Sequence, residues 1–281
     1  MDTRLQTQPE SYRQTISRSL MLYRLSFGKI AIFAFLLSCV VFIPRVISDI
    51  LGRDLYNQAN LLSWDRIWLF ILDISSLVFF IAILWHMYCV LLRINEPMLQ
   101  DLQTGLKKVL SVFVAAFIQC LLVSMVALLA FGIIMLLIKM DLLFNRSLIG
   151  TLFTTAVFFG QMILILYTST LFFFIIPLIA IENKGIIKAL EKSVSLVWNH
   201  AWRVFSTQIT PWATYIAILI VLKYLVSIDV HIFFTTKNTH SYSSTIINIV
   251  LFTLFIPWVA ALSLSQLKDL ELRKSLAQTK H

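Results

Sequence analysis

The chain has 281 residues, of which 59% are hydrophobic and only 13% are charged, and its mean hydropathy is +0.86. Soluble domains carry about 25% charged residues, so this composition excludes a soluble globular protein. The net charge of +9 could favour nucleic-acid binding, but the basic residues are spread over several segments and no nucleic-acid motif accompanies them, so we expect no nucleic-acid partner.

Six apolar runs are long enough to cross a bilayer, which requires about 20 residues per helix. We predict spans at approximately 27–48, 67–92, 109–138, 150–181, 204–227 and 245–267. The fourth run is the longest, and we expect its helix to tilt or protrude. The predicted fold class is therefore an all-α integral membrane protein with about six transmembrane helices.

The polar residues outside these runs set the predicted domain boundaries. Residues 1–10 form a polar N-terminal tail, and residues 11–267 form the six-helix transmembrane domain. Residues 268–281 form a basic C-terminal tail, which we expect to be cytoplasmic.

The segment between the fourth and fifth runs is mixed in character over about twenty residues, far more than a tight loop needs. At helical spacing it has one apolar stripe, formed by Ile186, Ile187, Leu190, Val194, Val197, Trp198 and Ala201. The opposite stripe is polar and basic, formed by Lys188, Lys192, Ser195, Asn199 and Arg203. This pattern is typical of a helix lying in the membrane interface. We expect Lys184, Lys188, Lys192 and Arg203 to face lipid headgroups.

Similar amphipathic segments precede the first and third runs. The first repeats apolar residues at three and four at Tyr12, Ile16, Leu20, Tyr23 and Phe27, and the other follows Pro97 with Leu99, Leu102, Leu106 and Val109. Two hypotheses stay open: three duplicated units, each an interfacial helix followed by a transmembrane hairpin, or amphipathic helices that resemble one another by necessity.

The passage from 177 to 205, PLIAIENKGIIKALEKSVSLVWNHAWRVF, and the segment ISRSLMLYRLSFGKI together carry a resemblance. They resemble the YciC family of bacterial inner-membrane proteins, which is related to the membrane region of some glycerophosphodiester phosphodiesterases. The resemblance covers nearly the whole chain. It implies an inner-membrane protein with no agreed biochemical activity, because the phosphodiesterase relatives carry catalysis in a separate soluble domain.

Polar residues inside spans are the usual functional candidates in membrane proteins. Here they are Arg45, Asp73, His86, Gln119 and Gln161. We expect the two glutamines to form hydrogen bonds between helices. We also expect Arg45 and Asp73 to approach each other and join the first hairpin. This structural role is favoured over a proton relay, because no second buried acid is visible.

The common catalytic and nucleotide-binding motifs are absent: HExxH, GxSxG, GxxxxGK[ST] and GxGxxG. The five histidines fall in different segments. We therefore expect no enzymatic activity, no cofactor and no metal site.

Orientation follows from the lysines and arginines of the connecting segments. Of the 23, the side that holds both termini and the even-numbered connections collects 16, and the other side collects 7. We expect both termini in the cytoplasm of a bacterium, with anionic lipid headgroups of the inner membrane as the partner. The favoured function is envelope organisation or stress tolerance. The alternative is a small-molecule transporter or a lipid-handling protein.

Overall fold

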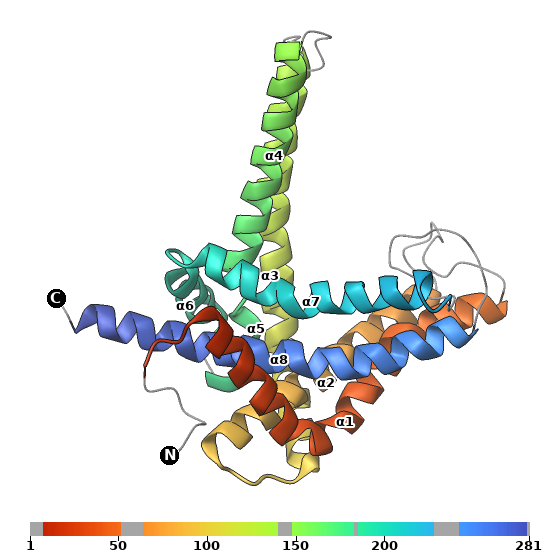
Figure 1. The fold of residues 1–281 in the computed structure, drawn as a ribbon. Helices are drawn as coiled ribbons and strands as arrows, with labels where there is room; N and C mark the ends of the chain where they lie inside the picture. The colour runs from red at the N-terminus through yellow and green to blue at the C-terminus, as the bar shows by residue number, and fades with distance from the viewer. Residues whose placement is uncertain (1–7, 52–63, 140–147, 183–184, 228–241, 280–281) are drawn as a thin grey trace.

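The computed structural model describes residues 8–51, 64–139, 148–182, 185–227 and 242–279. Within these ranges the secondary structure is eight helices (Figure 1). Their bounds are α1 Tyr12–Leu51, α2 Trp64–Leu92, α3 Met98–Lys139, α4 Leu148–Leu171, α5 Ile175–Glu182, α6 Ile186–Val197, α7 Ala201–Tyr224 and α8 Tyr242–Gln278. Six stretches of helix in this part of the chain are long and apolar enough to cross a membrane, which confirms the predicted fold class.

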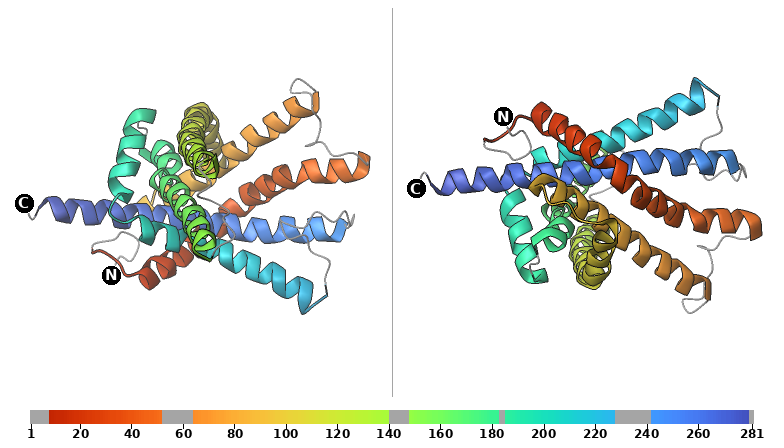
Figure 2. Two further views of the ribbon diagram at one scale, coloured as in Figure 1. Left: turned by 90° about the horizontal axis from the view of Figure 1, so that it is seen from above. Right: turned by 90° about the horizontal axis from the view of Figure 1, so that it is seen from below.

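The helices form two arms that leave a common base. One arm contains most of α1, with α2, α7 and the first half of α8; seen from above, these fan out in the order α2, α1, α8, α7 (Figure 2). The second arm is the hairpin of α3 and α4, which stands at a steep angle to the first (Figure 1). We call the base the hub. It comprises the described residues of 8–26, 85–111, 172–207 and 262–279.

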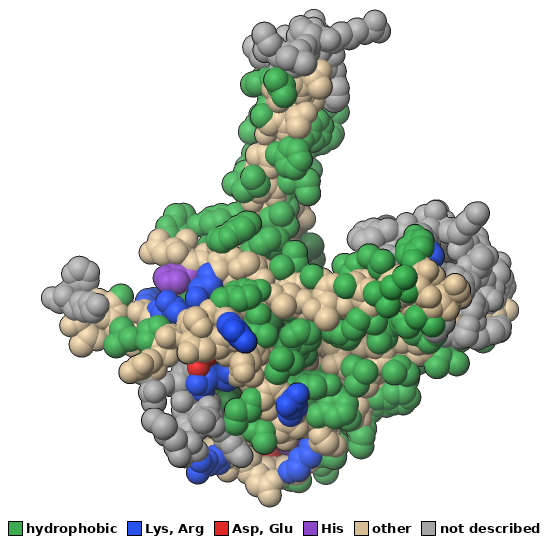
Figure 3. Space-filling view, viewed as in Figure 1, with side chains coloured by type: hydrophobic (Ala, Val, Ile, Leu, Met, Phe, Trp, Pro, Cys, Tyr) green, Lys and Arg blue, Asp and Glu red, His purple; other side chains and the backbone are tan. Residues whose placement is uncertain are grey.

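Charge and apolar surface are divided between these regions. Figure 3 shows that hydrophobic side chains cover the arms on the face drawn, whereas most of the visible lysine and arginine side chains gather at the hub. Apolar side chains on the arms are widely exposed, as at Leu128 and Leu129 of α3 and Phe159 of α4. An apolar surface of this extent is stable in lipid and not in water.

The core of the protein lies where the first arm meets the hub. Ile30, Leu84, Leu178 and Leu264 have no exposed surface there, and each comes from a different helix. The backbones of α2 and α3 approach closely at Gly105 of α3, where a Cβ atom would lie 2.6 Å from the carbonyl oxygen of Val78 in α2. Glycine is therefore needed for α2 and α3 to pack at this distance.

The fourth predicted span, residues 150–181, is not one tilted helix. A turn at residues 172–174 separates α4 from α5, and α5 folds into the hub with six of its eight residues buried. Pro177 explains the position of the turn. Its ring lacks an N–H and would clash with the carbonyl group of Phe173 in a continuous helix. The length of this run is thus divided between the two helices α4 and α5.

The three predicted amphipathic segments also differ from one another in the structure. The segments before the first and third spans are the opening turns of the continuous helices α1 and α3. Only α6 is separate. It ends at Val197, a turn follows at residues 198–200, and α7 then begins. We expected Ala201 and Arg203 to lie on the amphipathic helix, but they belong to α7. The buried face of α6 is formed by Ala189, Ser193, Leu196 and Val197.

The end of the chain differs from the tail that we predicted for residues 268–281. Helix α8 continues through Gln278, beyond the sixth predicted span and past Pro257 within it. Leu270 and Asp269 are buried in this extension. The extension is therefore part of the hub.

Candidate functional site in the hub

The hub contains a buried cluster of charges centred on Asp269 of α8, which has no exposed surface. Its Oδ2 atom accepts hydrogen bonds from Arg273 Nε at 2.9 Å and from Arg203 Nη2 at 3.1 Å. Its Oδ1 atom accepts from the backbone N–H of Glu10 at 2.8 Å. Arg203 and Arg273 also donate to the Glu10 carbonyl oxygen, at 2.5 and 2.6 Å. The cluster thus joins the N-terminal segment, the first turn of α7 and the last turns of α8.

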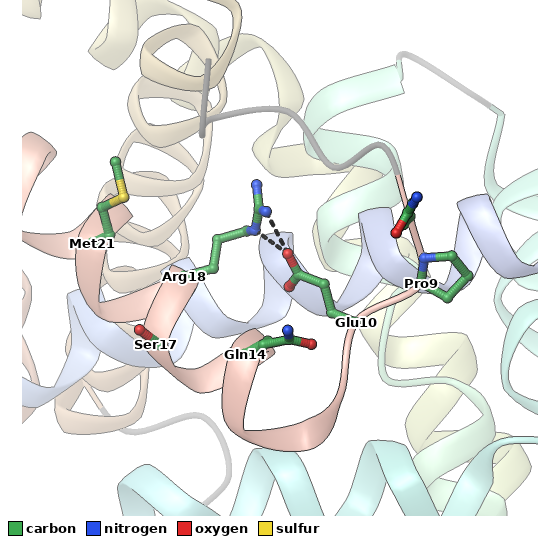
Figure 4. Close-up of a pocket in the computed structure, with 7 residues that line it drawn as sticks. Pro9, Glu10, Gln14, Ser17, Arg18 and Met21 are labelled. Atoms are coloured by element: carbon green, nitrogen blue, oxygen red, sulfur yellow. Dashed lines mark hydrogen bonds and ion pairs between the residues drawn. The ribbon is translucent and has the colours of Figure 1, made fainter. Parts of the chain in front are cut away.

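A cavity of about 360 Å³ lies beside this cluster, where the chain enters α1 (Figure 4). The Glu10 and Arg18 side chains point toward one another along its wall and form an ion pair. Gln14, whose Oε1 accepts from the Ser11 backbone N–H at 2.8 Å, also lines the cavity. This first turn is thus fixed by local hydrogen bonds as well as by the ion pair.

A second charge cluster joins α5, α6 and α8 through Lys192. Its ammonium group donates to Glu182 Oε1 at 2.5 Å and also contacts Glu271. Lys268 donates to the other oxygen of Glu271 at 2.8 Å. Burial by itself lowers the pKa of Lys192, but the bonds to Glu182 and Glu271 outweigh it and raise the pKa above its usual value. Lys192 therefore stays protonated at neutral pH.

These contacts involve two of the lipid-headgroup candidates. Lys192 and Arg203 form ion pairs with carboxylates of the protein, and their contact with lipid headgroups stays a prediction. Lys188 is exposed on α6, as a headgroup contact requires. Lys184 lies outside the described residues.

His86 and Asp101 form a buried pair between the end of α2 and the start of α3. Nδ1 of His86 lies 2.7 Å from Oδ2 of Asp101, and their side chains are 3% and 0% exposed. We expected His86 to be an isolated polar residue within a span. The structure instead pairs it with a carboxylate one helix further along the chain.

The remaining intramembrane candidates do not converge on one site. Gln161 of α4 donates to the carbonyl oxygen of Ala130 in α3 at 2.7 Å, an interhelical hydrogen bond of the expected kind. Gln119 is half-buried on α3, and its side chain has no hydrogen-bond partner among the described residues. Asp73 is exposed on α2, and the Arg45 side chain is not described. Their pairing stays a prediction.

Sequence reasoning missed Glu10, Asp101, Gln208 and Asp269, all of which are buried. Gln208 donates through Nε2 to Oε1 of Gln266 at 2.7 Å, a polar bridge between α7 and α8. One signal was present: Asp269 precedes Arg273 by four residues, which is the spacing of an ion pair on a helix. The other partners lie far apart in the chain, and no local pattern connects them.

Glu182, Glu271 and Asp269 of the hub each bind a cation of the same chain. His200 lies between α6 and α7, and its pKa is lowered by burial and by the nearby Arg273 and Arg203. Within the described ranges, no group of three or more His, Cys, Asp or Glu side chains could hold a metal ion.

Comparison of the chain with protein-family models, with curated protein sequences and with solved structures gave no match.

Proposed function

We propose that this chain is a non-enzymatic protein of the bacterial cytoplasmic membrane that helps to organise the cell envelope or to withstand envelope stress. The observation that carries the proposal is the joining of two apolar arms by one hub in which buried charges pair with one another. Such an arrangement fixes the relative positions of membrane-embedded helices without leaving a reactive group at a common point. The resemblance to the YciC family supports the inner-membrane location.

We place the hub in the cytoplasm. The support is the excess of lysine and arginine in the segments that form it, because cytoplasmic loops are enriched in these residues. Introduced cysteines would test this after replacement of Cys39, Cys89 and Cys120. Ser275→Cys should react with a membrane-impermeant maleimide only in opened cells, and Val226→Cys should react in intact cells. Reaction of Ser275→Cys in intact cells would reverse the orientation.

The role itself can be tested by deleting the gene in its source bacterium. We expect lower survival under osmotic and detergent stress and higher permeability to a fluorescent dye that the intact envelope excludes. Wild-type protein should restore both properties, and an Asp269→Asn variant should restore them less well. Unchanged survival and permeability in the deletion strain would contradict the proposal.

A lipid-handling function is the second candidate, and one cavity favours it. An apolar cavity of about 240 Å³ lies where the two arms separate, between the end of α4 and the start of α7. Its lining residues are Leu166, Ser169, Thr170, Phe173, Val204, Phe205, Gln208, Ile209 and Trp212. Purified protein in liposomes would distinguish the two functions. Movement of fluorescent lipid between leaflets, or flux of a small molecule, would favour lipid handling or transport.

A further inference from the structure

One more cavity of the hub has lysines in its wall and no carboxylate among its described lining residues. It has a volume of about 470 Å³, within the range of roughly 300–1,000 Å³ that ligand sites occupy. It is lined by Trp85, Thr104, Lys107, Lys108, Ser111, Ile179 and Gly185. The cavity beside Arg18 includes Glu10, and the groove between α6 and α8 includes Glu191 and Glu271 beside its lysines. Here two lysines form the wall without a carboxylate among the described lining residues.

The two lysines are held differently. Lys108 donates to the Ala180 carbonyl oxygen at 2.6 Å, and its ammonium group lies 4.6 Å from the centroid of the Trp85 ring. These contacts fix its position, while an ammonium group has three donors and only one is used by Ala180. Lys107 is exposed, and no other described residue forms an ion pair with it.

The polar groups of the wall lie on one face of α3. Thr104, Lys108 and Ser111 follow one another at spacings of four and three residues. The Thr104 hydroxyl donates to the Gln100 carbonyl oxygen at 2.9 Å, so it offers an acceptor, and Ser111 offers an exposed hydroxyl. Glu96 accepts a hydrogen bond from Trp85 Nε1 at 2.8 Å, so this nearby carboxylate is already engaged by a residue of the wall.

The position of the cavity selects a ligand that is anionic at one end and apolar at the other. The lysines come directly before the predicted start of the third span, and tryptophan near them is typical of the membrane boundary. Trp85 and Ile179 supply apolar surface to the same wall. An acyl chain can lie along this apolar surface while a phosphate group meets the lysines.

We propose that this cavity binds the phosphate of an anionic phospholipid headgroup. Lys107 and Lys108 supply the positive charge, Ser111 donates a hydrogen bond, and Trp85 forms the boundary between the headgroup and the acyl chains. The site differs from the expected one on α6, where Lys192 is neutralised by Glu182 and Glu271.

Native mass spectrometry of the full-length protein in detergent, titrated with phosphatidylglycerol or phosphatidylcholine, would test the site. Wild-type protein should retain phosphatidylglycerol more strongly. Lys107→Gln should weaken that binding about fivefold, the factor expected for a basic residue at an anionic surface. Ser111→Ala leaves the charge unchanged and should weaken binding about threefold. The matched control is Lys139→Gln, which removes an exposed lysine from the far end of the same helix and should change binding less than twofold.

Two results would overturn the proposal: equal loss in Lys107→Gln and Lys139→Gln, or equal retention of the two lipids by wild-type protein. Lys107 is exposed and its replacement leaves the Lys108 contacts in place, so this variant should fold. A competition with inorganic phosphate or glycerol 3-phosphate identifies the source of the phosphate. Persistence of bound lipid supports a phospholipid, whereas complete displacement would overturn the lipid assignment in favour of a soluble phosphate compound.

Discussion

The carboxylate of Asp269 accepts a hydrogen bond from the backbone N–H of Glu10 at 2.8 Å, although 259 residues separate the two in the chain. Asp269 is fully buried and also binds Arg203 and Arg273. Removing its charge would leave two arginines in the hub without their carboxylate. Asp269 and Arg273 thus both join the described beginning of the chain to its end.

We therefore expect Asp269→Asn to destabilise the protein by about 3 kcal/mol, because breaking one partner of a buried ion pair leaves uncompensated charge. The measurement is the midpoint of thermal unfolding in detergent. Glu191→Gln is the matched control, since it removes a carboxylate from the exposed face of α6. Equal midpoints for the two variants would show that the Asp269 cluster contributes little.

A second prediction follows from the close packing of Gly105 against Val78. A methyl group at Gly105 would meet the Val78 carbonyl oxygen at 2.6 Å, so α2 and α3 would have to separate. We expect Gly105→Ala to lower stability by about 1–3 kcal/mol through overpacking. Gly132→Ala lies on the same helix with nothing within 4 Å of its added methyl group, and should be neutral or slightly stabilising. If both variants unfold alike, the close approach of α2 and α3 is wrong.

The buried pair of His86 and Asp101 should show energetic coupling. We expect His86→Ala and Asp101→Ala each to reduce stability, and the double variant to lose less than the sum by about 1–3 kcal/mol. Chemical unfolding of the four proteins in detergent gives the coupling energy. Additive effects would mean that the two side chains do not interact in the folded protein.

His200 should make the stability of the hub depend on pH. Burial, together with Arg273 and Arg203, lowers its pKa below the ordinary value of 6.5, and Asp269 opposes this in part. Below pH 6.5 the unfolded chain therefore binds a proton that the folded protein does not, and stability falls as the pH falls toward the folded pKa.

Thermal unfolding between pH 5 and pH 8 would measure this effect. His200→Gln should unfold with a smaller loss of stability on acidification than wild-type protein, because glutamine does not titrate. The difference between the two curves removes the contribution of the other titrating groups. Parallel curves would contradict the prediction.

The number and approximate positions of the spans could be predicted because each apolar run exceeds the bilayer requirement by itself. The turn that interrupts the fourth span and the continuation of α8 beyond the sixth span could not be predicted. Hydropathy does not distinguish the turn before Pro177 from a continuous fourth span. It also does not show that the charged end of α8 remains helical, since the partners of Asp269 come from segments 66 and 259 residues away.

Single residues of the candidate site could also be predicted from the sequence only in part. His86 and Gln161 were recognisable as polar residues in apolar runs, but the partner of His86 was not. Lys192 satisfied the pattern of a headgroup contact, yet Glu182 and Glu271 approach it from other helices. Periodicity identifies the face on which a residue lies, and only the tertiary arrangement decides what that face meets.

The continuity of α3 gives the second arm the mechanical character of a lever. From Gly105 in the hub to Lys139 at its tip the helix is about 50 Å long, at 1.5 Å per residue. A rotation of about 5° at the contact with Val78 would therefore move the tip by about 4 Å. A small change in the packing around Gly105 or Asp101 would be amplified at the far side of the membrane.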